Sequence, residues 1–450
     1  MSQGDSRLLI VNANVVNEGS SFMGWLYAEG EFIEALGEGD APGEYVRKAS
    51  EIVDAQGKYL LPGAIDEHVH FREPGLTQKA DIASESRAAV VGGITSFLDM
   101  PNTRPLTVTS RAVDDKLEIA GRTSMANYGF FIGATNDNLD ELLHADYSRT
   151  PGVKLFLGSS TGNMLVDRRE FLMRLLNEVK APIAVHAESE SRILENRRKY
   201  LEMNGNPNDL PLEYHTEIRD RQACFDASQL IVSLAKETGA RLHLMHVSTA
   251  DELSLLEPGP VAGKRITAET CPQYLLFDKS QYGERGTRIK CNPAIKEASD
   301  SEALMQALKD GTIDCVGSDH APHLLADKEG GALKAASGMP MLQFSLCVMM
   351  GKLSAVKVAE KMCHNPAQVF AIDRRGFLRP GYYADMVLVE QLPAPYTISD
   401  DMVVSRCGWT PLRGMELRHR VASTWVNGRL VWDGVRFGEK SALPLKFLPK

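Results

Sequence analysis

Short apolar runs alternate with longer amphipathic segments from residue 60 to about residue 320. Turn-forming residues bound each apolar run, as is typical of buried β-strands. We expect eight strands, at Leu60–Ile65, Thr95–Met100, Ala126–Ala134, Val153–Leu157, Ile183–Val185, Leu242–Met245, Arg265–Ala268 and Ile313–Val316. Good helix formers at helical spacing lie between them, for example in Arg169–Glu178, Ala223–Lys236 and Ser301–Lys309. Because strands that alternate with helices form parallel sheets, eight such units predict a TIM-type (β/α)8 barrel.

Both ends of the chain show strand patterns without intervening helical segments. The expected strands are Leu8–Val16, Trp25–Ala28, Phe32–Leu36, Ala384–Val389 and the two arms of a hairpin within Thr424–Trp432. The hairpin is indicated by Asn427-Gly428, a two-residue turn signal between apolar alternations. We therefore predict a small β-sandwich domain built from both termini, residues 1–60 and 377–450, beside a catalytic barrel at 61–376.

Composition and charge point to a soluble enzyme. Of the 450 residues 43% are hydrophobic and 24% charged, values that are ordinary for a globular protein. The formal net charge of −9 argues against nucleic acid and anionic membranes as partners, so a small anionic substrate would need local positive charge in its site. Seven scattered cysteines without a CxxC pair fit reduced thiols. Met1–Arg7 lacks a signal-peptide pattern and no apolar run could span a bilayer, so we expect a cytoplasmic protein.

The first candidate for chemistry is His68-Val69-His70, which follows the apolar run that begins at Leu60. Side chains alternate along a strand, so the two imidazoles would lie on one face. Two imidazoles at a strand end could bind one borderline-soft metal ion such as zinc. The alternative is that one histidine caps the strand while the other packs in the core.

Other predicted strands also end in residues with ligand chemistry, namely Lys154, His186, His246 and Asp319. Barrel enzymes build their active sites at the carboxyl ends of the strands, so these side chains should meet His68 and His70. Six such residues exceed what one tetrahedral ion needs. Two ions would require a shared anion to hold them close together.

Lys154 could supply that anion. It lies among apolar neighbours in Gly152–Leu157, where desolvation lowers the pKa of an amine. A neutral amine can add carbon dioxide to form a carbamate, which can bridge two ions. The alternatives are a lysine that extends its ammonium to solvent, and hydrogen-bonded core histidines at 186 and 246. We assign no chemistry to the remaining histidines considered, His144, His215, His243, His364 and His419.

Four motifs together resemble the dihydroorotase family of cyclic amidohydrolases. They are Asp66–Gly75 with its HxHFREPG sequence, Asp99–Thr103, Gly317–His323 and Gly381-x-x-Ala384-Asp385. The resemblance covers nearly the whole chain. It implies two zinc ions bridged by N6-carboxylated Lys154 and a hydroxide, one ion also held by His68, His70 and Asp319, the other by His186 and His246. It also implies Asp319 as general base and acid while the hydroxide attacks the ring amide.

The substrate implied by this resemblance, dihydroorotate, carries a carboxylate that needs a fixed cation. Arg72 lies two residues after His70, which predicts the same strand face, and its fork can grip a carboxylate. In allantoinase-like sequences, the position that corresponds to Arg72 resembles an asparagine. The resemblance adds Asn102 and His323 as carboxylate partners and Asn292 as a ring contact. The alternative for Arg72 is an ion pair with a neighbouring acid such as Glu73.

Two departures from the family pattern concern the substrate side. The family arginine of Asn-Pro-Pro-x-Arg is Lys296 here, which leaves its role open, and the loop Ser337–Pro340 lacks a usual acidic residue. The resemblance implies reversible interconversion of N-carbamoyl-L-aspartate and L-dihydroorotate in de novo pyrimidine biosynthesis, by a homodimer. The alternatives are an allantoinase or hydantoinase-like enzyme and a non-catalytic, dihydroorotase-like scaffold subunit.

Overall fold

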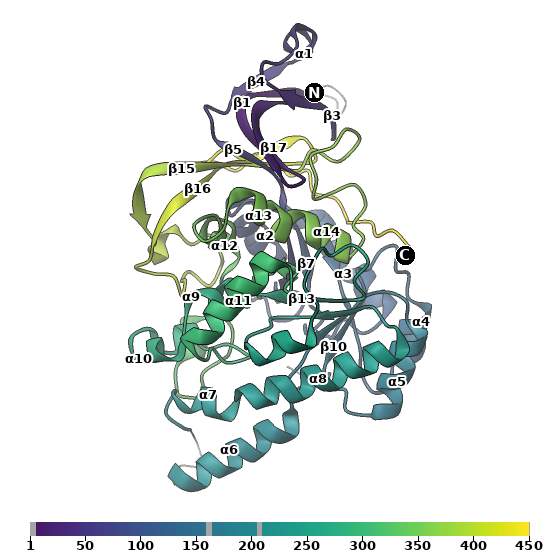
Figure 1. The fold of residues 1–450 in the computed structure, drawn as a ribbon, viewed down its shortest axis with the longest axis vertical. Coiled ribbons are helices and arrows are strands. Elements are labelled where there is room, and N and C mark those ends of the chain that lie inside the picture. The colour runs from purple at the N-terminus through teal and green to yellow at the C-terminus, as the bar shows by residue number, and fades with distance from the viewer. Residues whose placement is uncertain (1–5, 159–163, 205–208, 450) are drawn as a thin grey trace.

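The computed structural model describes residues 6–158, 164–204 and 209–449, so most of Met1–Arg7, used above to judge targeting, lies outside it. It consists of a barrel surrounded by helices and a separate sheet at one end, which includes the first strands of the chain (Figure 1). The barrel strands are β6 (Ala64–Val69), β7 (Ile94–Asp99), β8 (Asn127–Phe130), β9 (Ile132–Gly133), β10 (Val153–Phe156), β11 (Ile183–His186), β12 (Leu242–Leu244), β13 (Ile266–Thr270) and β14 (Cys315–Val316).

Every pairing between neighbouring barrel strands is parallel. The strands pair in the orders β6-β7-β8 and β9-β10-β11-β12-β13-β14. β8 and β9 are two halves of one predicted strand, separated at Phe131, and a parallel bridge between Val69 and His320 closes the ring. The (β/α)8 barrel and seven of the eight predicted strands are thus confirmed. The first prediction, Leu60–Ile65, is wrong in its bounds, because Leu60–Pro62 belongs to a strand of the separate sheet and only Ala64 and Ile65 lie on the barrel strand β6.

Helices follow most of the barrel strands, and local sequence signals set their ends. The Asp220 side chain accepts a hydrogen bond from the Ala223 amide at the start of α8, and Gly239 ends that helix with a φ of 67°. The helices are α1 (Gly43–Lys48), α2 (Ile82–Val91), α3 (Ser110–Thr123), α4 (Leu139–His144), α5 (Arg169–Glu178), α6 (Glu190–Asn204), α7 (Tyr214–Ile218), α8 (Arg221–Thr238), α9 (Pro272–Leu276), α10 (Tyr282–Arg285), α11 (Ala298–Asp310), α12 (Leu342–Met350), α13 (Ala355–Ala359) and α14 (Asn365–Val369). Shorter turns are the 3-10 helices η1 (Asp251–Leu255), η2 (Lys279–Gln281), η3 (Gly286–Ile289), η4 (Leu325–Lys328) and η6 (Asp400–Met402), and the π-helical turn η5 (Glu360–His364).

The separate sheet joins strands from both termini, as predicted. Its strands are β1 (Arg7–Asn17), β2 (Ser20–Glu29), β3 (Phe32–Glu38), β4 (Glu51–Asp54), β5 (Tyr59–Pro62), β15 (Met386–Thr397), β16 (Glu416–Val426) and β17 (Arg429–Trp432). In place of two stacked sheets they form one mixed sheet, because β5 pairs with β1 in parallel and with β15 antiparallel. Asn427 and Gly428 have φ values of 49° and 72°, as the predicted hairpin turn requires.

Two segments beyond β15 reach back to the barrel. Trp409, which is fully buried, donates its indole N–H to the His323 carbonyl at 2.7 Å. Near the C-terminus, Phe447 packs in a cluster with Ile65 and Phe131 of the barrel. The division into 1–60, 61–376 and 377–450 therefore stays a prediction, since parts of the last segment pack with the barrel.

All seven cysteines are buried and unpaired. Among the described helices, none combines the length and the apolar character that crossing a bilayer would require.

Candidate metal centre and substrate cavity

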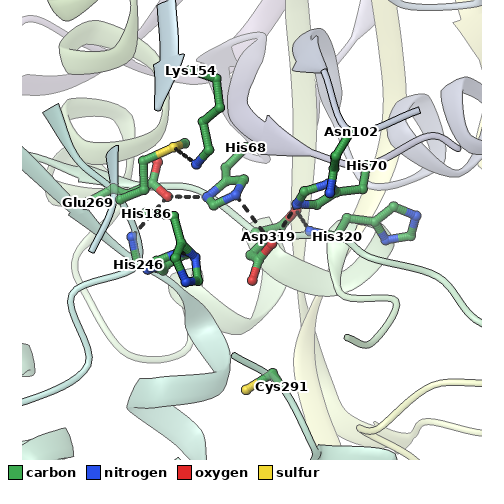
Figure 2. Close-up of polar contacts among 12 residues, drawn as sticks. His68, His70, Asn102, Lys154, His186, His246, Glu269, Cys291, Asp319 and His320 are labelled. Atoms are coloured by element: carbon green, nitrogen blue, oxygen red, sulfur yellow. Dashed lines mark hydrogen bonds and ion pairs between the residues drawn. The ribbon is translucent and has the colours of Figure 1, made fainter. Parts of the chain in front are cut away.

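The six residues predicted as metal ligands lie together at the carboxyl ends of the barrel strands (Figure 2). His68, Lys154 and His186 lie on β6, β10 and β11. His70, His246 and Asp319 lie in the loops that follow β6, β12 and β14. All six side chains are buried or nearly so. Figure 2 shows the imidazoles of His68 and His70 directed at Asp319, whereas His320 points away from it.

His68, His70 and Asp319 form the first half of the centre. Nε2 of His68 lies 3.3 Å and Nε2 of His70 lies 3.1 Å from Oδ1 of Asp319. These three residues bring one donor atom each within 4.8 Å of one another, and all three are acceptable zinc ligands. Asp319 has a φ of 47°, a left-handed backbone conformation of the kind that is concentrated at functional sites.

His186 and His246 form the second half. Nδ1 of His186 and Nε2 of His246 are 2.8 Å apart, so the two imidazole nitrogens face each other. The His246 ring lies 5.4 Å from the His68 ring between centroids, which places the two halves side by side. His246 also has a left-handed φ, of 41°.

Lys154 extends into the same region from β10. Its Nζ lies 2.6 Å from Sδ of Met245 and 4.9 Å from the centroid of the Phe156 ring. No carboxylate of the described residues forms an ion pair with it. Burial lowers the pKa of the amine to about 8, although Glu269 and Asp319 act in the opposite direction. The lowered pKa enlarges the neutral fraction of the amine near neutral pH, and the neutral amine is the form that adds carbon dioxide.

Three of the histidines have their second ring nitrogen occupied by an acceptor. Nδ1 of His68 lies 2.5 Å from Glu269, and Nδ1 of His70 lies 2.8 Å from Oδ1 of Asn102. Nε2 of His186 lies 2.9 Å from Glu188, which also pairs with buried Arg219. Such contacts fix the tautomer and direct the other nitrogen toward a metal ion.

Burial and neighbouring charges give these groups the protonation states that a metal site needs. Burial lowers the pKa of His70 to about 4 and that of His246 well below its usual value, so both rings are neutral at pH 7. Burial would raise the pKa of Asp319, but His68, His70 and Lys154 hold it below its ordinary value. Neutral imidazoles, a carboxylate and a lysine that can be neutral fit a site for two divalent ions.

A cavity of about 490 Å³ opens over the centre. Eight lysine or arginine side chains line it, against two acids, Glu190 and Asp319. The excess of basic groups contrasts with the acidic chain as a whole, and it favours a negatively charged substrate.

Arg72 lies in the wall of this cavity and is 7% exposed. Its Nε donates to the Pro322 carbonyl at 3.1 Å and its Nη2 lies 3.1 Å from Nε2 of His323. Glu73 instead accepts a hydrogen bond from the Ile82 amide, and no described carboxylate forms an ion pair with Arg72. Arg72 thus reaches the cavity as expected, but strand alternation does not place it there. β6 ends at Val69 and Arg72 has a φ of 68°, so a left-handed turn brings it to the cavity.

The other predicted substrate residues also reach the cavity, which is lined by Asn102, Asn292 and His323. The Oδ1 atom of Asn292 is buried and has no hydrogen-bond partner among the described residues. Lys79, which was not predicted, lies 3.0 Å from Nδ1 of His323 through its Nζ. Nothing in the sequence around Lys79, which follows the FREPG motif, indicated that this lysine would lie in the cavity.

Two further observations concern residues whose roles were left open or excluded. Lys296 does not line the cavity; it is buried and donates to the Ala294 carbonyl at 2.9 Å. His215 and His243 were assigned no chemistry, but His215 lines the cavity and His243 lies 3.4 Å from Glu269. Ser337 and Gly338 of the loop without an acidic residue also line the cavity.

Comparison with known proteins now adds to this geometry. The amidohydrolase family profile matches residues 59–431, which span the barrel and much of the separate sheet. The chain belongs to the amidohydrolase family. Its relatives include dihydroorotases, an allantoinase and hydantoinases, and the resemblance to dihydroorotases is confirmed.

Three relatives show how the similarity is distributed. A dihydroorotase of Halobacterium salinarum is 34% identical over 90% of this chain and 92% of its own. An allantoinase of Bacillus velezensis is 31% identical over 86% and 87% of the two chains. The solved L-hydantoinase of Arthrobacter aurescens superposes with a TM-score of 0.88 at 26% identity, covering 98% of this chain and 99% of that one. The similarity therefore extends over most of this chain in all three comparisons, and the L-hydantoinase shares its fold.

Proposed function

We propose that this protein is a zinc-dependent dihydroorotase that interconverts N-carbamoyl-L-aspartate and L-dihydroorotate in de novo pyrimidine biosynthesis. The observation that carries this proposal is the buried guanidinium of Arg72, which faces the metal cavity without a carboxylate partner among the described residues. A buried cation of this kind is suited to a substrate carboxylate, with which it can form a bidentate pair. Allantoin and hydantoin rings carry no such group.

The proposed metal centre would hold two zinc ions, with N6-carboxylated Lys154 as a ligand to both. His68, His70 and Asp319 would hold one ion, and His186 and His246 the other. When bound, the ions activate water and polarise the ring carbonyl. Asp319, kept ionised by the histidines around it, accepts a proton from the attacking water and delivers it to the ring nitrogen as the C–N bond breaks. Ring closure follows the same steps in reverse.

The remaining residues would bind and orient the substrate. Arg72 and His323 would hold the carboxylate. Asn102 accepts from His70 through Oδ1, which leaves its NH2 group to donate to the same carboxylate. The unpartnered Oδ1 of Asn292 would accept a hydrogen bond from a ring N–H.

The decisive experiment compares substrates on one preparation of known metal content. Initial rates are measured with L-dihydroorotate, allantoin and hydantoin, together with zinc per chain. We expect two zinc ions and a strong preference for dihydroorotate. Faster turnover of either uncharged ring would identify an allantoinase or hydantoinase, and no turnover of any ring at full metal occupancy would identify a scaffold subunit.

We also propose that the protein acts as a cytoplasmic homodimer on a small anionic substrate, without a nucleic-acid or membrane partner. Light scattering coupled to size-exclusion chromatography tests the dimer, which a monomer mass would contradict.

A further inference from the structure

A second cavity lies at the opposite end of the barrel from the metal centre. It has a volume of about 530 Å³ and is lined largely by residues that precede or begin β11, β12 and β13. These strands are parallel and in register, with Ile183 beside Leu242 and Leu242 beside Ile266, so their amino ends form one rim. A cavity of this size is in the range that small-molecule ligands occupy.

The charged residues of this cavity are all basic. Lys180, Arg241, Lys264 and Arg265 line it, and no aspartate or glutamate is among its described lining residues. Lys264 is neutralised by Asp314, at 2.9 Å. The other three side chains have no ion-pair partner among residues 6–158, 164–204 and 209–449. They contact backbone carbonyls instead, at distances of 2.5–2.7 Å.

Two of these cations lie close enough to repel each other. The Leu242 amide donates to the Arg265 carbonyl at 2.8 Å, so Arg241 and Arg265 start adjacent strands side by side. Arg241 is half-buried, and both its burial and the charge of Arg265 lower its pKa. Like charges held together without a counter-ion disfavour the folded state, and a bound anion would relieve that cost.

We propose that this cavity is a binding site for a small, multiply charged anion that carries a phosphoryl group. Arginine forks bind phosphate oxygens in pairs, and two forks with a lysine supply more positive charge than a single carboxylate requires. The site is separate from the metal cavity, since none of the residues that line one lines the other. The proposal goes beyond the proposed enzymatic function and does not depend on it.

The test measures binding of adenosine 5′-monophosphate to the metal-loaded protein by isothermal titration calorimetry at low ionic strength, with inorganic phosphate as a second probe. The variant is Arg241→Gln combined with Arg265→Gln. The matched control is Arg111→Gln combined with Arg122→Gln on α3, which removes the same charge from two exposed arginines that have acidic partners. A third protein, Arg72→Gln, reports binding in the metal cavity.

We expect the Arg241/Arg265 variant to bind the nucleotide at least about tenfold more weakly, while the control and the Arg72 variant retain their affinity. Loss of binding only in the Arg72 variant would place the nucleotide in the metal cavity and overturn the proposal. Equal affinity in all the proteins would also overturn it, as would a wild-type protein that shows no binding at about 10 mM probe.

Thermal unfolding without ligand separates a binding role from a structural one. Removal of two mutually repelling charges should leave the melting temperature unchanged or raise it. A lower melting temperature with unchanged nucleotide affinity would show that the arginines serve only the fold. If the double variant cannot be purified, Arg265→Gln alone, at an exposed position, is expected to weaken binding severalfold.

Discussion

Replacement of Arg72 by glutamine should separate substrates that carry a carboxylate from those that do not. The guanidinium is buried at 7% exposure, and its described contacts are the Pro322 carbonyl and His323. Burial lowers its pKa to about 10, which still leaves it charged at pH 7. Glutamine keeps a hydrogen-bonding side chain but removes both the charge and the fork.

The size of the effect follows from the burial of the pair. Removal of one partner of a desolvated charge pair costs roughly 2–5 kcal/mol, and about 1.4 kcal/mol corresponds to a tenfold change in rate. The kcat/KM for dihydroorotate should therefore fall roughly 30- to 4,000-fold. Turnover of 5,6-dihydrouracil, a related ring without a carboxylate, should change much less.

The assay measures kcat/KM for both rings together with zinc content on each sample. Arg104→Gln is the control, because Arg104 lines the same cavity but is exposed, so the same loss of charge should cost little. Arg72→Lys separates the effect of the charge from that of the bidentate fork, and its kcat/KM for dihydroorotate should lie between those of the wild type and Arg72→Gln. Equal losses on both rings with zinc retained would refute the role of Arg72 as carboxylate anchor.

Further predictions concern the metal, the proton and the fold. Lys154→Ala should lose one or both zinc ions, measured by metal analysis; full occupancy and activity without added carboxylate would exclude the bridge. Because the neutral amine adds carbon dioxide and the pKa of Lys154 is about 8, reactivation of metal-free protein at a fixed concentration of dissolved carbon dioxide should accelerate from pH 6 to 8 and level off only above about pH 9; a rate that is flat or falls between pH 6 and 8 at constant dissolved carbon dioxide would contradict the role of the neutral amine. Asp319→Asn should lower kcat by about 10²–10⁴-fold with zinc retained, and near-normal turnover would remove Asp319 from proton transfer. Lys116→Met leaves buried Asp99 unpaired and should lower the free energy of unfolding by about 3–5 kcal/mol, whereas Arg122→Met on the same helix breaks an exposed pair and should change it by less than about 1 kcal/mol, as urea denaturation would show. Equal losses in the two variants would contradict the role of burial.

The barrel was predictable because its strands are short apolar runs, and the segments between them repeat their apolar residues at helical spacing. α5 spans the predicted Arg169–Glu178, and the turn at Asn427-Gly428 follows from residue types that tolerate positive φ. The arrangement of the terminal strands was not predictable, because pairing partners far apart in sequence leave no local signal. β5 joins β1 to β15 in one sheet, and only the three-dimensional structure shows this pairing.

The candidate metal ligands were easier to identify in the sequence than the residues that contact them. Few side chains suit zinc, so histidines and an aspartate at strand ends carry a strong signal. An imidazole N–H, in contrast, can donate to a carboxylate, a side-chain amide oxygen or a backbone carbonyl, and here Glu269, Asn102 and Glu188 are the acceptors. Glu269 lies 201 residues from His68, so no spacing connects them. Arg72 is a second example. Its residue type indicated a carboxylate site, but its left-handed backbone conformation could not be predicted from strand alternation. Residue chemistry identifies which groups can react, and the fold decides how each of them is held.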